Sequence, residues 1–175
     1  MGTARYSTKP FPPYRFIPGR NPHPTENPQG HSYGKPEDTV EPLSLDHWSQ
    51  NETYLHGIDL YNHQYWWEAH EAWESLWKRD SKNALTKEFL QGLIKTSAAF
   101  IKWESKTPRG IKLHYQAAIA HFKNVVEKYP VYMGIDLRAH IDRLTQCFES
   151  VLNVPASGLW PKSSKNYPVI QLQKN

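Results

Sequence analysis

The sequence has very little cysteine and no long apolar run. Its single cysteine, Cys147, can form neither an intramolecular disulfide nor a metal site with several cysteine ligands. No stretch of about eighteen apolar residues occurs, so no transmembrane helix is expected. The first residues also lack the apolar core of a signal peptide. These absences predict a cytoplasmic protein that does not enter a membrane, with Cys147 as an inert core thiol.

The loops that usually bind nucleotides or carry a nucleophile are also missing. The sequence has no GxGxxG, no GxxxxGK[ST] and no GxSxG motif. It has no HExxH motif and no Glu-x-x-His pair, the pattern found in di-iron helical bundles. A familiar nucleotide loop, a hydrolase elbow and a standard helical metal centre are therefore unsupported, and the sequence identifies no cofactor.

Charge is plentiful but unevenly distributed. The formal net charge is +4, which suggests a polyanionic partner until the charge is assigned to segments. Residues 1–43 hold five basic and four acidic residues, residues 44–153 hold thirteen of each, and residues 154–175 hold three lysines and no acid. A nucleic-acid surface normally needs clustered cations on the folded part of a protein. We therefore expect no nucleic-acid partner.

The N-terminal part of the chain is rich in proline. Nine of the fourteen prolines lie in residues 1–43, where regular helix or sheet is not expected. This part is either a disordered tail or an extended arm packed on the domain. Its large apolar side chains favour the arm: Phe11, Tyr14, Phe16, Ile17 and Tyr33. The chain should thus divide into an arm over 1–43, a helical domain over 44–153 and an extended tail over 154–175.

Apolar residues recur at helical spacing through the middle of the chain. The expected helices cover residues 50–61, 65–79, 84–105, 108–128 and 137–152. Short connections between them favour antiparallel neighbours. The second of these helices carries large aromatic residues on both sides, so it should be central and mostly buried. The expected fold class is all-α, a compact bundle of about five antiparallel helices with extended N- and C-terminal arms.

Three polar residues are expected to cap these helices. Ser49, followed by Glu52, forms a capping-box pattern before the first helix. Thr107 precedes Pro108, which is a good first residue of a helix. Asp136 is expected to cap the last helix.

The most unusual segment of the sequence covers residues 66–77 and reads WWEAHEAWESLW. Residues three or four apart lie on neighbouring turns of a helix, so Glu71 neighbours both Glu68 and Glu74. His70 in turn neighbours Glu74. Burial beside tryptophan rings raises the pKa of a carboxyl group, which suits it to acid–base chemistry near neutral pH. Glu71, Glu74 and His70 are therefore the candidate catalytic residues.

Further side chains are candidates for ligand binding around this segment. Gln91 is expected on the following helix, beside Gly92, where backbones can approach closely. The candidate ligand-binding residues are Glu68, Trp67, Trp77 and Gln91. The arm could close the site as a lid if it is ordered, with His23 and His31 reaching the site and with Tyr14, Arg15 and Arg20 pairing with the glutamates.

Two runs of this chain resemble the family catalogued as domain of unknown function 309. The family pattern is an EAHE…W helix followed by FLQGLI on the next helix, matched here by residues 57–77 and 89–94. The resemblance covers residues 52–125. The arm segments YRFIPG, PHP and GHS are also similar to the N-terminal extension of one bacterial branch of that family.

The resemblance implies a small all-α bundle and brings no settled activity. The signature residues of the family would fall here on Glu68, His70, Glu71, Glu74, Trp77, Gln91 and Gly92. The resemblance therefore implies that these residues form either a functional site or a structural centre of the fold.

Three functions remain open from the sequence. The first is a small-molecule binding or acid–base catalytic pocket on the EAHEAWE helix, without a metal ion. The second is a non-enzymatic module of tetratricopeptide-like helix pairs that binds a peptide or protein. Residues 118–130 resemble the second helix of a tetratricopeptide unit. The third is a homodimer in which the acidic segment serves packing alone, its buried Glu and His hydrogen-bonded to Trp indoles, helix ends and the N-terminal arm.

Overall fold

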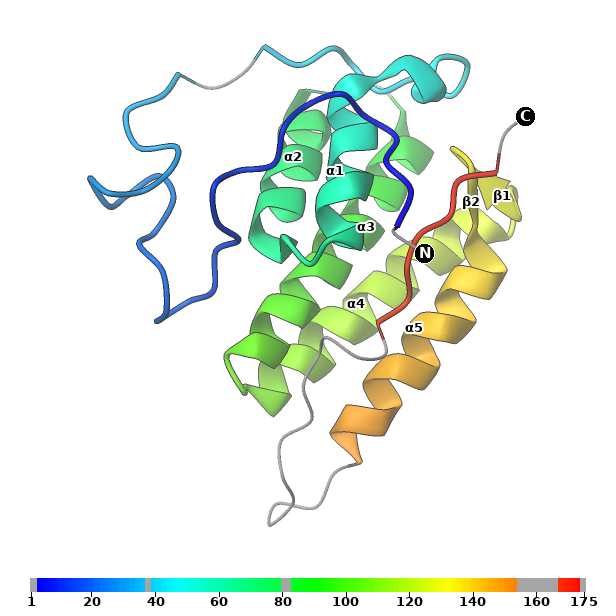
Figure 1. Cartoon of the computed structure of the whole chain (residues 1–175). Coiled ribbons are helices and arrows are strands. Elements are labelled where there is room, and N and C mark those ends of the chain that lie inside the picture. Colours follow the sequence, from blue (N-terminus) through cyan, green and yellow to red (C-terminus); the bar gives the residue numbers. More distant parts are fainter. Residues whose placement is uncertain (1–2, 37–38, 80–82, 154–166, 174–175) are drawn as a thin grey trace.

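The computed structural model describes residues 3–36, 39–79, 83–153 and 167–173, and most of these residues form helices. The helices are α1 (Glu52–Asn62), α2 (Trp66–Arg79), α3 (Ala84–Glu104), α4 (Pro108–Val126) and α5 (Leu137–Leu152). Each of the first four packs on the helix that follows it along the chain. Extended segments from both ends of the chain lie against this bundle (Figure 1). The expected all-α bundle is therefore confirmed.

The cap of α1 differs from the expected one. A short 3-10 helix, η1 (Trp48–Gln50), occupies the position where the capping box was expected. Asn51 is the N-cap instead, and its side chain accepts a hydrogen bond of 2.9 Å from the amide of Tyr54. The prediction that Ser49 caps this helix was therefore wrong. Ser49 and Asn51 can both cap a helix, but Ser49 lies within η1, so α1 begins after it.

The other two caps differ in strength. The Asp136 side chain accepts from the amide of Ala139 at 3.0 Å, as expected. Thr107 does occupy the N-cap position of α4, but its hydroxyl donates to the carbonyl of Ser105 at 3.2 Å and makes no capping bond. The start of α4 thus depends on Pro108 rather than on a side-chain cap.

A small hairpin between α4 and α5 was not expected from the sequence. Strands β1 (Val131–Tyr132) and β2 (Ile135–Asp136) pair in an antiparallel manner across a two-residue turn. Both turn residues have positive φ, 46° at Met133 and 79° at Gly134, as in a type I′ turn. Methionine is uncommon at the first position of such a turn, so only Gly134 in the sequence indicates the hairpin.

The core is aromatic and centres on α3, which packs between α2 and α4. Trp66 of α2 stacks on Phe100 of α3 with ring centroids 4.4 Å apart, and Tyr61 meets Trp66 edge to face at 5.2 Å. Such pairs add to the energy of burial. Among the α2 tryptophans, Trp66 and Trp73 are buried, whereas the other two are only half-buried. Only five of the fourteen residues of α2 are buried, so the expectation that this helix is mostly buried was wrong.

Close packing of α1 on α2 depends on a glycine. A Cβ atom at Gly57 would lie 2.8 Å from ring atoms Cδ1 and Cε2 of Trp73. Trp73 is itself fully buried, so its ring has no free space to move into.

Replacing this glycine tests the α1–α2 contact. Gly57→Ala is expected to lower the free energy of unfolding by about 2 kcal/mol or more, because the new methyl group overpacks the core. Gly110→Ala is the matched control, since its Cβ would meet the flexible side chain of Lys102, and alanine favours a helix. Urea unfolding measures both, and equal stabilities for the two variants would contradict the packing argument.

One histidine is buried without a polar partner. His140 on α5 is 0% exposed, and neither of its ring nitrogens has a hydrogen-bond partner among the described residues. Its ring lies edge to face against Phe122 at 5.5 Å. Burial, with a smaller contribution from the charge of Arg143, lowers the pKa of His140 from its usual value of 6.5 to about 3.

This burial predicts a loss of stability in mild acid. His140 stays neutral in the folded chain, whereas in the unfolded chain it binds a proton below about pH 6.5. The unfolded state therefore binds more protons as the pH falls from 6.5 toward 3, and stability decreases over that range. In His140→Leu, the slope of unfolding free energy against pH should fall by up to about 1.4 kcal/mol per pH unit. Urea unfolding from pH 7 to pH 4.5 measures it, and an unchanged slope would contradict the assignment.

Candidate functional site

The candidate residues on α2 do not all face one site. Trp67 and Glu68 face the N-terminal arm, whereas His70 contacts the backbone of α3. The helical rotation of about 200° between residues 68 and 70 separates these two sides. The residues singled out from the sequence thus form two groups on one helix that have different contacts.

The first cluster ties Glu68 to the arm. Glu68 Oε1 accepts from the backbone amide of Phe16 at 2.8 Å, and lies 3.1 Å from Nε2 of His31. The Glu68 and His31 side chains are only 4% and 5% exposed. Burial raises the pKa of Glu68, and the hydrogen bonds from the backbone and from His31 partly oppose this shift. Its second oxygen, Oε2, is buried and has no partner among the described residues.

Trp67 lies beneath aromatic rings of the arm. The edge-to-face centroid distances from Trp67 are 5.7 Å to Phe16, 5.4 Å to His23 and 6.4 Å to His31. His31 is held from the other side by Tyr14, with ring centroids 4.8 Å apart. The arm therefore covers Trp67 and Glu68, so both residues belong to the contact that fixes the arm.

The second cluster brings together the three candidate catalytic residues. One possible ligand atom each from His70, Glu71 and Glu74 lies within 4.8 Å of the other two, and none of these residues is fully buried. Glu68 is not a member of this group. The expected neighbourhood of His70, Glu71 and Glu74 is thus present, and it is confined to one and a half turns of α2.

His70 is oriented by the neighbouring helix. Its Nδ1 lies 3.3 Å from the carbonyl oxygen of Ile94 on α3, an acceptor that requires a proton on Nδ1. Burial, with smaller effects from Lys95 and Lys78, lowers the pKa of His70, while Ile94 and Glu74 oppose the shift. The imidazole is therefore neutral at pH 7, and Nε2 keeps its lone pair.

The remaining two candidates lie at the edge of this cluster. Trp77 is half-buried against the core and follows His70 and Glu74 on the same stripe of α2. Gln91 is half-buried on α3, one turn before Ile94, and its side chain makes no hydrogen bond to the residues that the structure describes. Glu74 itself forms an ion pair of 2.8 Å with Lys78.

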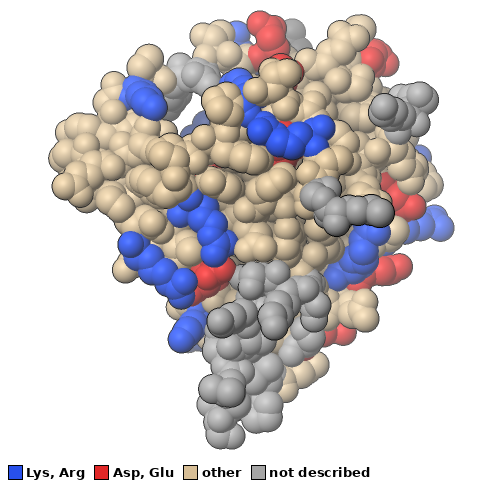
Figure 2. Space-filling model, in the orientation of Figure 1, with Lys and Arg blue, Asp and Glu red and all other residues tan. Residues whose placement is uncertain are grey.

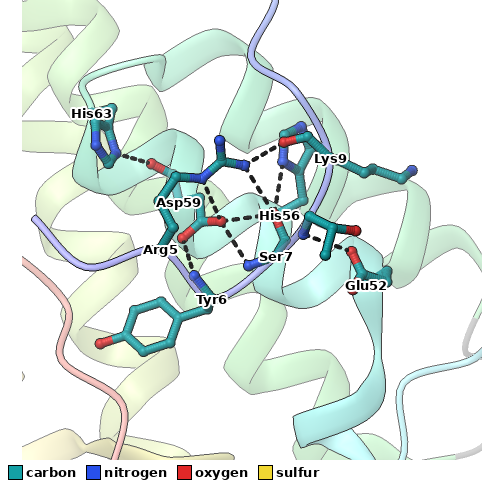
Figure 3. Close-up of polar contacts among 9 residues, drawn as sticks. Arg5, Tyr6, Ser7, Lys9, Glu52, His56, Asp59 and His63 are labelled. Carbon is teal, nitrogen blue, oxygen red and sulfur yellow. Dashed lines mark hydrogen bonds and ion pairs between the residues drawn. The ribbon is translucent and has the colours of Figure 1, made fainter.

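A buried acid on α1 was missed from the sequence. Asp59 is 0% exposed, and its carboxylate accepts from the amides of Tyr6 and Ser7, both at 2.8 Å, and from the Ser7 hydroxyl at 2.7 Å (Figure 3). Arg5 Nε lies 3.3 Å from the same carboxylate. A signal did exist, since Asp59 follows Leu55 by one helical turn and therefore lies on the apolar face of α1.

The arginines of the arm do not pair with the glutamates of α2. Arg15 and Arg20 instead lie 4.0 Å from the two oxygens of Glu104, at the end of α3. Arg15 also donates to Gln64 at 3.0 Å. The expected pairing was wrong for these two arginines, because the arm passes the ends of α1 and α3 as well as α2. Of the two arm histidines, His31 reaches Glu68, whereas His23 contacts the Trp67 ring.

The surface shows no single dominant charge on the face drawn in Figure 2, where basic side chains lie dispersed among uncharged ones. Among the described residues, no helix is both long and apolar enough to cross a membrane.

A comparison with known protein families agrees with the resemblance seen in the sequence. A family model described as a domain of unknown function, DUF309, matches residues 54–113. The matched part begins in α1 and ends in the first turns of α4, so it contains the whole of α2 and α3. No curated protein matches the chain.

Removing the charge of Asp59 tests how the arm is held. Asp59→Asn is expected to lower the free energy of unfolding by about 2–4 kcal/mol, because an amide nitrogen would face backbone donors in a buried site. Trypsin should then cleave the arm faster at Arg5 and Arg15. The matched control is Asp142→Asn, an exposed residue of α5, with a change within about 0.5 kcal/mol. Equal stability and equal cleavage in both variants would contradict this role of Asp59.

Proposed function

We propose that this chain, whose residues 54–113 match the model of the domain of unknown function 309, binds a small, positively charged ligand at His70, Glu71 and Glu74. We further propose that His70 accepts or donates a proton there. The single observation that supports this function is the convergence of the three side chains within 4.8 Å.

The charges of the cluster favour a cationic ligand. Two carboxylates and a neutral imidazole leave the group negatively charged at pH 7, although Lys78 partly compensates Glu74. Carboxylate oxygens and an imidazole nitrogen are also donors that divalent ions such as Zn²⁺ accept. The sequence favoured a site without a metal ion, and the proposal treats such an ion as one probe of the class.

The proton-transfer role rests on the state of His70. Because Nδ1 faces the carbonyl of Ile94, the ring is fixed with Nε2 as the free basic nitrogen. A neutral imidazole that is oriented by a backbone carbonyl is suited to act as a general base. Glu71 or Glu74 would then stabilise the imidazolium that forms.

Two flanking residues would complete the site. The short connection between α2 and α3 makes the two helices antiparallel, and His70 lies opposite Ile94. One turn forward on α2 is then opposite one turn back on α3, which places Gln91 beside Glu74. Trp77 would bound the site toward the end of α2. Glu68 and Trp67 would act indirectly, by holding the arm.

Two glutamates three residues apart on α2 give a matched stability test. Glu71→Gln should leave the melting temperature unchanged or raise it, because a ligand-binding carboxylate is often neutral or costly for stability. Glu68→Gln should lower it by several degrees, because it disturbs buried hydrogen bonds to the arm. A large drop in Glu71→Gln would instead assign the cluster a structural role.

Ligand binding is tested with two dissimilar cations, Zn²⁺ and spermidine. Isotope-labelled protein is titrated with each, and the amide signals of His70 and Glu71 are expected to shift. His70→Gln should weaken binding by about tenfold or more, corresponding to the loss of one charge-assisted contact. The control is His121→Gln, which removes another histidine–glutamate pair, His121 and Glu88 at 3.0 Å, and should have no effect. If neither cation shifts the α2 signals, the proposal is wrong.

A further inference from the structure

The C-terminal segment 167–173 is bound to the bundle in the way that an extended peptide binds a protein. Asn62, at the end of α1, is 1% exposed. Its Nδ2 donates to the carbonyl of Ile170 and its Oδ1 accepts from the amide of Ile170, both at 2.8 Å. One side chain therefore pairs both backbone groups of one residue, as a neighbouring strand would.

Three separate parts of the chain supply the other backbone partners. The Tyr6 hydroxyl, from the arm, accepts from the amide of Leu172 at 3.1 Å. The carbonyl of Gly134, from the turn between β1 and β2, accepts from the amide of Gln173 at 2.7 Å. We call Tyr6, Asn62 and Gly134 the docking surface. In Figure 1 the C-terminal segment runs past the N-terminal end of the chain toward the hairpin.

Side chains of the segment alternate between inside and outside. Pro168 and Ile170 are buried and Leu172 is half-buried, whereas Gln171 and Gln173 are exposed. This period of two is that of an extended peptide read on one face. Tyr167 adds an aromatic contact, with its ring edge to face against Trp66 at 5.1 Å and its hydroxyl donating to the Asn62 carbonyl at 2.5 Å.

We propose that this surface is a peptide-docking site that can take the C-terminal segment of a second copy of the chain in exchange for its own. A second copy is the expected partner because its segment 167–173 has the same backbone groups and the same alternating side chains as the segment that already binds this surface. This inference uses none of His70, Glu71 and Glu74, so it stands apart from the proposed function.

The length of chain before the segment permits the exchange. Thirteen residues separate Asn153 from Tyr167 in the sequence, a distance of up to about 45 Å when fully extended. Docking within one copy is favoured at low concentration, because a short tether gives an effective concentration in the millimolar range. Exchange therefore requires concentrated protein, where it produces a dimer with the same contacts as the monomer.

Two complementary variants test the exchange. The tail variant, Tyr167→Ala with Ile170→Ser, weakens the segment and leaves the docking surface intact. The surface variant, Asn62→Asp, removes one donor from the surface and leaves the segment intact. At a few hundred micromolar, each variant alone should sediment as a monomer of 20.4 kDa. Their mixture should form a species of twice that mass, in which the intact segment occupies the intact surface.

A matched control and a second measurement keep the test decisive. Gln171→Ala, which changes an exposed side chain of the segment, should behave as wild type when it replaces the tail variant, giving no mixed dimer. If Asn62→Asp fails to fold, the labelled tail variant is titrated with a synthetic peptide of residues 167–173. The amide signals of Tyr6 and Gly134 should shift, and a peptide with Ile170→Ser should bind about tenfold or more weakly. Absence of a mixed dimer with both folded variants, or absence of these shifts, would overturn the proposal.

Discussion

The structure depends on satisfying two polar side chains that α1 buries one turn apart. Asp59 and Asn62 lie at the end of an otherwise apolar face, where an unpaired carboxylate or amide would cost several kcal/mol. Among the residues that the structure describes, no helix of the bundle supplies a side-chain or backbone partner for these two side chains. The N-terminal arm pairs with Asp59 and the C-terminal segment pairs with Asn62, so α1 joins both extended segments to the core. Neither segment is an independent appendage, because each completes a hydrogen-bond network that the bundle leaves open.

The contacts of the arm divide the candidate residues of α2 into two groups. On the arm side, Glu68 and Trp67 are enclosed and their contacts are made with residues of the arm. On the side toward α3, His70 is fixed by a backbone carbonyl, and the cluster that it forms with Glu71 and Glu74 is not fully buried. A signature that looks continuous in the sequence therefore combines one group that holds the arm with a second group of two carboxylates and an imidazole that lie close together. Substitutions of Glu68 and of Glu71 can distinguish the two groups, because both residues lie on the same helix and differ in their contacts.

The sequence predicts the helices well and the site only in part, for physical reasons. Helix spans follow from the spacing of apolar residues, which depends on neighbouring turns alone. The hairpin escaped prediction because its turn has Met133 where asparagine or aspartate is usual, and η1 displaced the cap from Ser49 to Asn51. Spacing along α2 correctly grouped His70, Glu71 and Glu74. It wrongly added Glu68 to that group, because the partners of Glu68 lie in the arm, far away in the sequence. Asp59, by contrast, was missed although its position on the apolar face of α1 can be seen in the sequence. An acid at such a position predicts a hydrogen-bonding partner from a distant part of the chain.

The basic residues of the arm acquire a structural meaning once these contacts are known. Of the basic residues in the arm, Arg5 faces Asp59, and Arg15 and Arg20 lie near Glu104. These cations neutralise the charge of Asp59 and Glu104 in the helical domain. Without the arm, the two carboxylates would be either exposed to solvent or buried without a cation beside them. A cation that is engaged in this way contributes less to the field that steers a polyanion than its formal charge implies. The basicity of the arm thus reflects how the arm is attached to the bundle.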